Sequence, residues 1–228
     1  PLKRWKAARL NGCGQTVCAT TPCRQQVVSL SLCCKIYWVS ETSNASEKRV
    51  FALPLCKGRG WLAINKPSGL AVQGGTSIAL HIDGMLKALT PRNAERLRLV
   101  HRIDKDTSGV LLLAKTLESA RVLTEAFHRH KLEKTYLAIV MGMPAESGRI
   151  RAPLKKLAGK AGQKMVVDDD GQAATTLYRR IDHAGRKLSL MALRPVSGRT
   201  HQLRVHMQHI NTPICGDGKY GGDAPHLG

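Results

Sequence analysis

Residues 110–114 form a continuous apolar segment, and a stretch of charged and turn-forming residues at 101–109 comes directly before it. An uninterrupted apolar run of this length, bounded by turn residues, is typical of a buried strand and requires a packed sheet around it. The preceding stretch places Asp104, Asp106 and a basic pair against this rigid element. Charged groups held beside a buried strand indicate a functional site at this point of the fold.

The rest of the chain shows strand and helix patterns without regular alternation. Helices are expected at residues 78–89, 119–130 and 200–210. The apolar faces of the second and third of these helices consist of Ala120, Leu123 and Phe127 and of Leu203, Met207 and Ile210. Further strands are expected at residues 61–64, 136–140, 148–153, 173–180 and 188–193, joined by polar turns that include residues 65–69, 168–171 and 183–185. This order favours an α+β domain built on a mixed, largely antiparallel central sheet.

The net charge of the chain indicates which kind of molecule it binds. Thirty-six Lys and Arg against 16 Asp and Glu give a formal net charge of +20, which attracts polyanions by phosphate contacts and counterion release. Nucleic acid is the leading partner, and the alternative is a generally basic, solvated surface. No apolar run reaches 18 residues, so we expect no membrane span. We also find no strongly basic amphipathic helix flanked by aromatics, which disfavours a membrane surface as partner.

Residues 1–57 differ in composition from the rest of the chain, so we expect a domain boundary after residue 57 and one domain at 58–228. The N-terminal part is basic and rich in Ser and Thr, and it holds six of the seven cysteines, namely Cys13, Cys18, Cys23, Cys33, Cys34 and Cys56. Their spacing repeats no zinc-ribbon pattern, so we expect free thiols in a reducing compartment, with structural zinc as a minor alternative. The composition suits either an organellar targeting segment or an RNA-binding extension.

Asp104 and Asp106 stand two residues apart, which in extended backbone places both carboxylates on one side of the chain. They therefore form either a carboxylate pair or simply part of a turn, since Asp, Ser and Thr are favoured turn residues. His101 and Arg102 supply charge partners beside them. A carboxylate held against an arginine stays ionised and can act as a nucleophile.

A second group of polar residues lies at 197–206. Gly198 supplies a turn and Thr200 is a candidate N-cap, after which His201 and Arg204 share one helical face. The alternative is a solvated basic helix face that contacts phosphate without specificity. A zinc site formed by His201, His206 and His209 is disfavoured, because His201 and His206 diverge on a helix.

Tyr136, directly after Lys134 and Thr135, begins a predicted strand. A tyrosine in that position most often packs in a core or along a sheet edge. Near an ionised aspartate, its phenol could instead stack on a base or relay a proton. The residue alone does not decide between these roles.

Five motifs in order resemble the ribosomal large-subunit (RluA-type) pseudouridine synthases, and the similarity is greatest to the branch that modifies 23S-type rRNA. The motifs occupy residues 65–70, 101–109, 134–136, 198–206 and 216–221. The resemblance covers residues 61–222. It implies the pseudouridine synthase fold with an active-site cleft across the sheet, and isomerisation of uridine to pseudouridine in RNA without metal or organic cofactor.

The resemblance also implies roles for single residues. Asp104 is the catalytic aspartate that promotes cleavage of the glycosidic bond, either by attack on the sugar or by helping to form a glycal. Arg204 pairs with Asp104, Tyr136 stacks on the flipped uracil, and Asp106 is a turn residue. Further substrate contacts are expected from Arg102, His101, Lys66, Arg199, His201 and Leu203. Arg102 would enter the space left by the extruded base, because base flipping leaves a gap in the stack, and Lys66 and Arg199 are phosphate or framework contacts.

The implied partner is RNA. Large-subunit rRNA or its precursor is the first candidate, tRNA is the alternative, and pre-ribosomal particles are a further candidate. We expect an intracellular monomer, in the bacterial cytoplasm or in an organelle such as the mitochondrial matrix. The competing hypothesis is a noncatalytic RNA-binding ribosome-assembly factor that retains the fold; a hydrolase using both acids is disfavoured, because it leaves the motif at 198–206 without a role.

Two features depart from the family pattern. Ile103 replaces the more usual Leu before Asp104, a change that conserves volume. The chain ends at Gly228, where family members continue with another strand, so we expect a truncated or divergent C-terminal end. The N-terminal part carries at most a diverged trace of the RNA-binding domain that family members often place there.

Overall fold

The computed structural model describes residues 53–75, 80–90, 95–157 and 164–221. The expectations for residues 1–52, including five of the six N-terminal cysteines, lie outside the described residues. Cys56 and Cys215 are described, and both are free thiols. Within the described part of the chain, no helix is long and apolar enough to cross a membrane.

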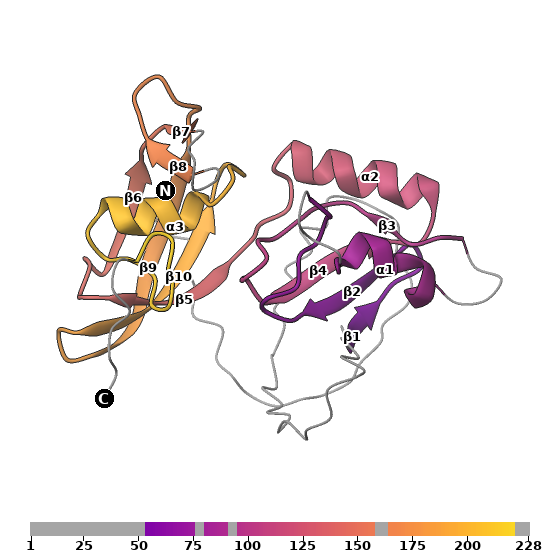
Figure 1. The fold of residues 1–228 in the computed structure, drawn as a ribbon, viewed down its shortest axis with the longest axis horizontal. Helices are drawn as coiled ribbons and strands as arrows, with labels where there is room; N and C mark the ends of the chain where they lie inside the picture. The colour runs from indigo at the N-terminus through magenta and orange to yellow at the C-terminus, as the bar shows by residue number, and fades with distance from the viewer. Residues whose placement is uncertain (1–52, 76–79, 91–94, 158–163, 222–228) are drawn as a thin grey trace, which may run out of the picture. The chain divides into compact units, whose positions relative to one another are not determined.

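The first sheet has four antiparallel strands in the order β1-β2-β4-β3 (Figure 1). They are β1 (Leu53–Lys57), β2 (Trp61–Lys66), β3 (Arg98–Leu99) and β4 (Gly109–Ala114). The apolar run at residues 110–114 lies in β4, and both faces of this strand are covered. Leu111 and Leu113 pack into one core cluster, whereas Leu112 and Ala114 pack into another. Burial on both faces explains why the run is continuous rather than alternating.

Two helices accompany this sheet, α1 (Ile82–Leu89) and α2 (Leu117–His128). Ile82 and Leu86 of α1 are buried in the cluster that contains Leu111 and Leu113. The predicted apolar face of α2, formed by Ala120, Leu123 and Phe127, packs on the other cluster, which confirms that prediction. The helix begins earlier than expected because Thr116 and Ser119 form a capping box. Helix α1 begins at Ile82, later than the predicted residue 78, and His81 forms a β-bridge with Ala71.

The second sheet has the strand order β5-β10-β9-β6, and its strands are also antiparallel. They are β5 (Tyr136–Met141), β6 (Ser147–Arg151), β9 (Thr175–Ala184) and β10 (Leu188–Pro195). A separate antiparallel ribbon consists of β7 (Leu154–Leu157) and β8 (Lys164–Val167). Helix α3 (Gln202–His209) contributes Met207 to the core of the second sheet, with Leu203 and Ile210 packed against that core. This confirms the predicted apolar face of the third helix.

The α+β class and the antiparallel pairing are confirmed. The expected strands are distributed over two four-stranded sheets, and a separate ribbon accompanies them in the described residues. The prediction missed β1, β3, β7 and β8, which are all short. β1 carries a proline, β7 and β8 carry lysines, and β3 has only two residues. Residues 53–57 were expected in the N-terminal extension. They pair with β2 instead, so the first sheet begins before the predicted boundary.

Candidate active site

Asp104 lies in the loop that connects β3 to β4. The backbone N–H of Thr107 donates to the carbonyl oxygen of Asp104 at 3.2 Å, which closes a turn around the carboxylate. The side chain of Asp104 is 31% exposed, so its carboxylate is open to a ligand on one side. The exposed Asp106 takes part in the turn through its carbonyl oxygen, which accepts the hydroxyl of Ser68 at 2.7 Å.

Lys66, at the end of β2, ties this loop to the preceding turn. Its ammonium group donates to the carbonyl oxygens of Pro67, Leu70 and Lys105 at 2.7, 2.7 and 2.8 Å. The side chain is fully buried, and burial lowers the pKa of Lys66 to about 8, against the opposing influence of Asp106 and Asp104. All three N–H donors are used by backbone groups. Of the two expected roles of Lys66, a phosphate contact or a framework contact, the observed hydrogen bonds are those of a framework contact.

His101 holds the same loop from the other side. Its Nε2 accepts the backbone N–H of Leu112 at 2.8 Å, and its ring stacks on Phe127 with centroids 4.3 Å apart. Burial, with a smaller contribution from the charge of Lys134, lowers the pKa of His101 to about 4. The imidazole is therefore neutral at pH 7, as its acceptor role requires. Strand β4 and helix α2 thus position the residues that lead to Asp104.

Arg204 connects Asp104 to a second acid. Its Nη1 lies 3.6 Å from Oδ2 of Asp104, while its Nε and Nη2 each donate to Asp217 at 2.7 Å. The hydrogen bond from Arg204 lowers the pKa of Asp217, although burial of that carboxyl acts in the opposite direction. The same hydrogen bond raises the pKa of Arg204. Asp217 therefore fixes one edge of the guanidinium and leaves the remaining nitrogen directed at Asp104.

Tyr220 lies beneath this pair and is almost fully buried. The guanidinium of Arg204 is 5.0 Å from the centre of the Tyr220 ring, a cation–π distance. The phenolic oxygen accepts the backbone N–H of Met165 at 3.0 Å and lies 2.8 Å from Nδ1 of His201. His201 and Arg204 therefore meet at the Tyr220 ring, but not as members of one helical face as predicted, because His201 precedes the first residue of α3.

The predicted N-cap of this helix is wrong. His201, not Thr200, occupies the N-cap position of α3, in a left-handed backbone conformation with φ 52°, and its side chain makes no cap hydrogen bond. That conformation directs the His201 ring to Tyr220 instead. His206 lies deep in the fold, with its two ring nitrogens 2.8 Å from Oγ1 of Thr176 and 3.0 Å from the carbonyl oxygen of Ala152.

Tyr136 is the first residue of β5 and is partly buried. Burial and the charge of Asp104 together raise the pKa of Tyr136 to about 12, so its phenol is neutral at physiological pH. The structure thus brings Asp104 and Arg204 into contact, and the charge of Asp104 also acts on the phenol of Tyr136, so that three separate segments contribute to the site.

The remaining predicted contacts divide into two kinds. Arg102 and Arg199 are exposed, and Arg199 donates from Nε to the carbonyl oxygen of Ala173 at 3.2 Å. Leu203 is partly exposed and packs against the core of the second sheet. Among residues 53–221 as far as they are described, no three His, Cys, Asp or Glu side chains form a group that could hold a metal ion.

The sequence reasoning assigned no role to Asp217, Tyr220 or Gln202. The motif at residues 216–221 contained the first two and was the available signal. Gln202 is buried, and its Oε1 accepts from the Ser197 hydroxyl and the Arg199 backbone at 2.8 and 3.0 Å. Its Nε2 donates to the second sheet at residues 175 and 176. Gln202 therefore fastens the loop before α3 to β9.

This arrangement combines one partly exposed carboxylate, a fixed guanidinium and a neutral phenol. An ionised carboxylate can attack an electrophilic carbon or remove a proton, and a neutral phenol can stack on a planar base or donate a hydrogen bond. These groups suit chemistry on a base and its sugar.

Comparisons with known proteins agree with this interpretation. A family model described as RNA pseudouridylate synthase matches residues 60–209. "Ribosomal large subunit pseudouridine synthase C" of Rickettsia bellii is 42% identical over 164 residues, which cover 71% of this chain and 54% of the relative. "tRNA pseudouridine synthase C" of Haemophilus ducreyi is 40% identical over 170 residues, covering 70% of both chains. The solved structure of "Human RNA Pseudouridylate Synthase Domain Containing 4" matches with a TM-score of 0.62 and 32% identity, covering 73% of this chain and 68% of the other. The chain spans about half the length of the Rickettsia relatives that it matches.

Proposed function

The chain belongs to the RNA pseudouridylate synthase family, and from that premise we propose that it isomerises uridine to pseudouridine in large-subunit rRNA. The observation that carries this proposal is the contact of Arg204 with the partly exposed carboxylate of Asp104, whose charge also acts on the phenol of Tyr136. In the reaction the bond between the sugar C1′ and N1 of uracil breaks, and C1′ bonds to C5 instead. The proton displaced from C5 leaves, and N1 gains one, so that the product is an isomer of the substrate.

Asp104 promotes the cleavage in one of two ways. Its carboxylate either attacks the sugar carbon or removes a proton from the sugar so that a glycal forms. The guanidinium of Arg204 balances the negative charge of Asp104 in both cases.

The target base must leave the RNA stack to reach Asp104. Unstacking costs a few kcal/mol, and stacking the free base on an aromatic ring and filling the gap offset that cost. Tyr136 supplies the ring, and the exposed Arg102, two residues before Asp104, supplies the filler. His201 and Arg199 then contact the RNA beside the target, while His101 and Lys66 act by holding the Asp104 loop.

The RNA substrate is proposed from the names of relatives. The Rickettsia relatives are named for the large ribosomal subunit and a Haemophilus relative is named for tRNA, so tRNA is an outcome that the test must distinguish. A ribosomal substrate would place the protein where ribosomes are, in the bacterial cytoplasm or the mitochondrial matrix.

The test is pseudouridine mapping of rRNA and tRNA from cells that lack the protein, followed by in vitro modification of the RNA that loses a site. Wild-type protein should restore the site, and Asp104→Asn should not, while it still binds the RNA. The Asn variant should fold, because Arg204 keeps its ion pair with Asp217. Asp106→Asn is the matched control and should retain activity within about twofold.

Three results would contradict the proposal in different ways. Full activity of Asp104→Asn would remove Asp104 from the mechanism. Loss of a site in tRNA alone would replace the substrate. RNA binding by wild-type protein without any pseudouridine would favour the noncatalytic RNA-binding factor, which the net charge of +20 also accommodates.

A further inference from the structure

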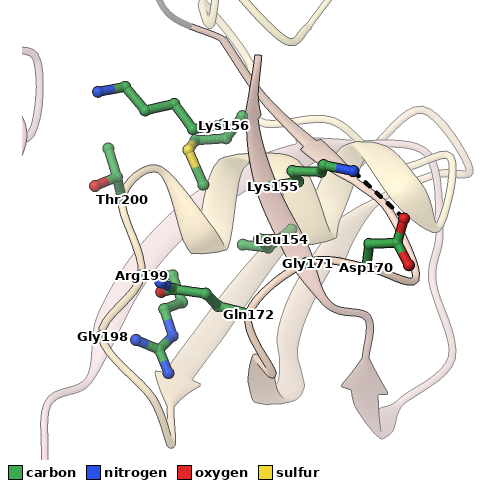
Figure 2. Close-up of a pocket in the computed structure, with 10 residues that line it drawn as sticks. Leu154, Lys155, Lys156, Asp170, Gly171, Gln172, Gly198, Arg199 and Thr200 are labelled. Atoms are coloured by element: carbon green, nitrogen blue, oxygen red, sulfur yellow. Dashed lines mark ion pairs between the residues drawn. The ribbon is translucent and has the colours of Figure 1, made fainter.

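A cavity of about 360 Å³ lies between the β7–β8 ribbon and the loop that precedes α3 (Figure 2). None of Asp104, Arg204 and Tyr136 lines it. Its walls come from β7, from Met165 of β8, from the turn at 170–172 and from the loop at 198–200. Binding cavities for small organic groups start at about this size.

The walls are held in place by hydrogen bonds. Leu154 and Gln172 exchange backbone hydrogen bonds at 2.9 and 2.8 Å, and Gly171 donates to the carbonyl oxygen of Asp168 at 2.8 Å. Across the cavity, the side chain of Gln202 accepts from the backbone of Arg199, as described above. The cavity therefore exists before any ligand arrives, which reduces the cost of ordering on binding.

The lysines of β7 lie on opposite faces of the ribbon. Lys155 forms ion pairs with Asp168 and Asp170 at 3.3 and 3.5 Å, and Figure 2 shows it directed at Asp170. Lys156 pairs in register with Met165, so these two side chains share the other face of the ribbon, together with Leu154. Leu154 on that face packs with Val205 of α3. Lys156 thus lies on the α3 side of the ribbon, and Lys155 is already neutralised by acids.

Two cations of the cavity are available to a ligand. Within the described residues, neither Lys156 nor Arg199 has an ion pair, and both are exposed. Arg199 uses only Nε, toward Ala173, which leaves both terminal nitrogens of its guanidinium. A charge-assisted hydrogen bond to phosphate is the strongest contact that these groups can make.

The rest of the lining suits a nucleobase. Met165 is the partly exposed apolar side chain of the lining, backed by the buried Leu154, and a thioether packs well against an aromatic ring. The side chains of Gln172 and Thr200 are exposed at the rim, where an amide and a hydroxyl can bond the edge of a base. Cations, an apolar side chain and polar rim groups together match one nucleotide rather than a bare phosphate.

The cavity is linked to the Asp104 site through Tyr220. The backbone of Met165, on the cavity wall, donates to the phenol of Tyr220, and that ring underlies Arg204. The loop at 198–200 also leads directly into His201, which contacts the same phenol. A ligand in the cavity therefore lies one layer of side chains from the proposed catalytic pair.

We propose that this cavity binds a second nucleotide of the substrate RNA, near the target uridine, with its base over Met165 and its two flanking phosphates on Arg199 and Lys156, which lie at opposite ends of the lining (Figure 2). This assignment rests on the proposed function, since it requires an RNA substrate. It makes the cavity a determinant of which uridine is modified, because the target must lie at the correct spacing from the bound nucleotide.

The test compares Lys156→Gln/Arg199→Gln with Arg186→Gln/Lys187→Gln. The control removes two exposed cations from the turn at the far end of β10, about 25 Å along the strand from the cavity loop. The RNA is a short fragment that contains the mapped uridine. The cavity variant should raise the KM for this RNA at least tenfold with kcat within about twofold, and should lower the salt slope of binding by about two. The control should stay within about threefold.

A second arm identifies the nucleotide. Fragments with single abasic positions around the target are bound to wild type and to the cavity variant. Wild type should lose affinity about tenfold at one position, and the cavity variant should show no such loss there. Equal KM values for cavity variant and control, or equal abasic losses in wild type and variant, would overturn the assignment. If the wild-type protein forms no pseudouridine, the proposed function is wrong. The binding measurements with abasic fragments still show whether the cavity binds a nucleotide.

Discussion

Asp217 binds the guanidinium of Arg204 through two hydrogen bonds of 2.7 Å, and the side chain of Asp217 is only 5% exposed. Such a bidentate pair fixes the plane of the guanidinium as well as its position. The third nitrogen, Nη1, is the one that lies 3.6 Å from Asp104. The orientation of the proposed catalytic pair is therefore set by a residue outside it.

The first prediction is that Asp217→Asn lowers kcat about tenfold to hundredfold without changing the KM for RNA. An amide cannot hold both nitrogens of Arg204, so Nη1 loses its fixed direction toward Asp104. Asp182→Asn, an exposed carboxylate on β9, is the charge-matched control and should retain wild-type rates. Steady-state assays over a range of RNA concentrations give both constants. A change in KM with constant kcat would show that Asp217 acts on RNA binding instead.

Part of this site could be predicted from the sequence, because those features depend on residues that are close together in the chain. The apolar run of β4 and the turn around Asp104 are adjacent in the chain, and the helical spacing of Leu203, Met207 and Ile210 identifies the buried face of α3. The contact between Arg204 and Asp217 was not predictable in this way, because it depends on how the segment after α3 returns to the helix. Pairing order within sheets is also nonlocal, which is why one central sheet was expected and two were found.

Lys66 and His101 show a second limit of sequence reasoning. Both belong to motifs that imply RNA contact, and both types of side chain commonly bind phosphate. In the structure, the ammonium group of Lys66 donates to three backbone carbonyls, and Nε2 of His101 accepts from the backbone of β4. A motif indicates that a residue belongs to the site. Only its burial and its hydrogen-bond partners show whether it positions other residues or contacts the RNA.

The second prediction concerns Tyr136. Since its pKa is raised to about 12, the phenol stays neutral over the working pH range, and the ring is the part that acts. Tyr136→Phe should therefore keep the rate within about threefold, whereas Tyr136→Leu should lose about tenfold to hundredfold, the typical value of one base–aromatic stack. Rates from pH 7 to 9.5 should run parallel for wild type and Tyr136→Phe. A large loss in Tyr136→Phe would assign a proton transfer to the hydroxyl.

The third prediction concerns the backbone of the proposed nucleotide cavity. A Cβ at Gly171 would lie 2.6 Å from the carbonyl carbon of Leu154 and 2.7 Å from the carbonyl oxygen of Asp168. Neither backbone atom can move without breaking the bridge between residues 154 and 172. Gly171→Ala should destabilise the protein by roughly 1–3 kcal/mol, the usual cost of overpacking. Gly218→Ala is the control, because a Cβ there meets no atom within 4 Å. Equal urea midpoints for the two variants would contradict the packing argument.

The fourth prediction is a pH-dependent stability that originates at His101. The unfolded chain takes up a proton on this imidazole near pH 6.5, whereas in the folded state burial holds its pKa at about 4. The unfolded state therefore binds more protons between these values, so the stabilisation is complete above pH 6.5 and is lost as the pH falls toward 4. Between pH 7 and pH 5 the loss from His101 amounts to about 2 kcal/mol.

Urea unfolding of wild type and His101→Gln at pH 7 and pH 5 measures this contribution. Gln keeps an acceptor for the backbone N–H of Leu112 but does not titrate, so the free energy of unfolding should fall less between the two pH values, by about 2 kcal/mol. Ile150→Val is the control, because it loosens the core of the second sheet while His101 is intact, and it should show the wild-type pH dependence. If His101→Gln shows the wild-type dependence as well, the pKa of His101 is the same in the folded and unfolded states, and the buried contact with Leu112 does not hold the ring in its neutral form.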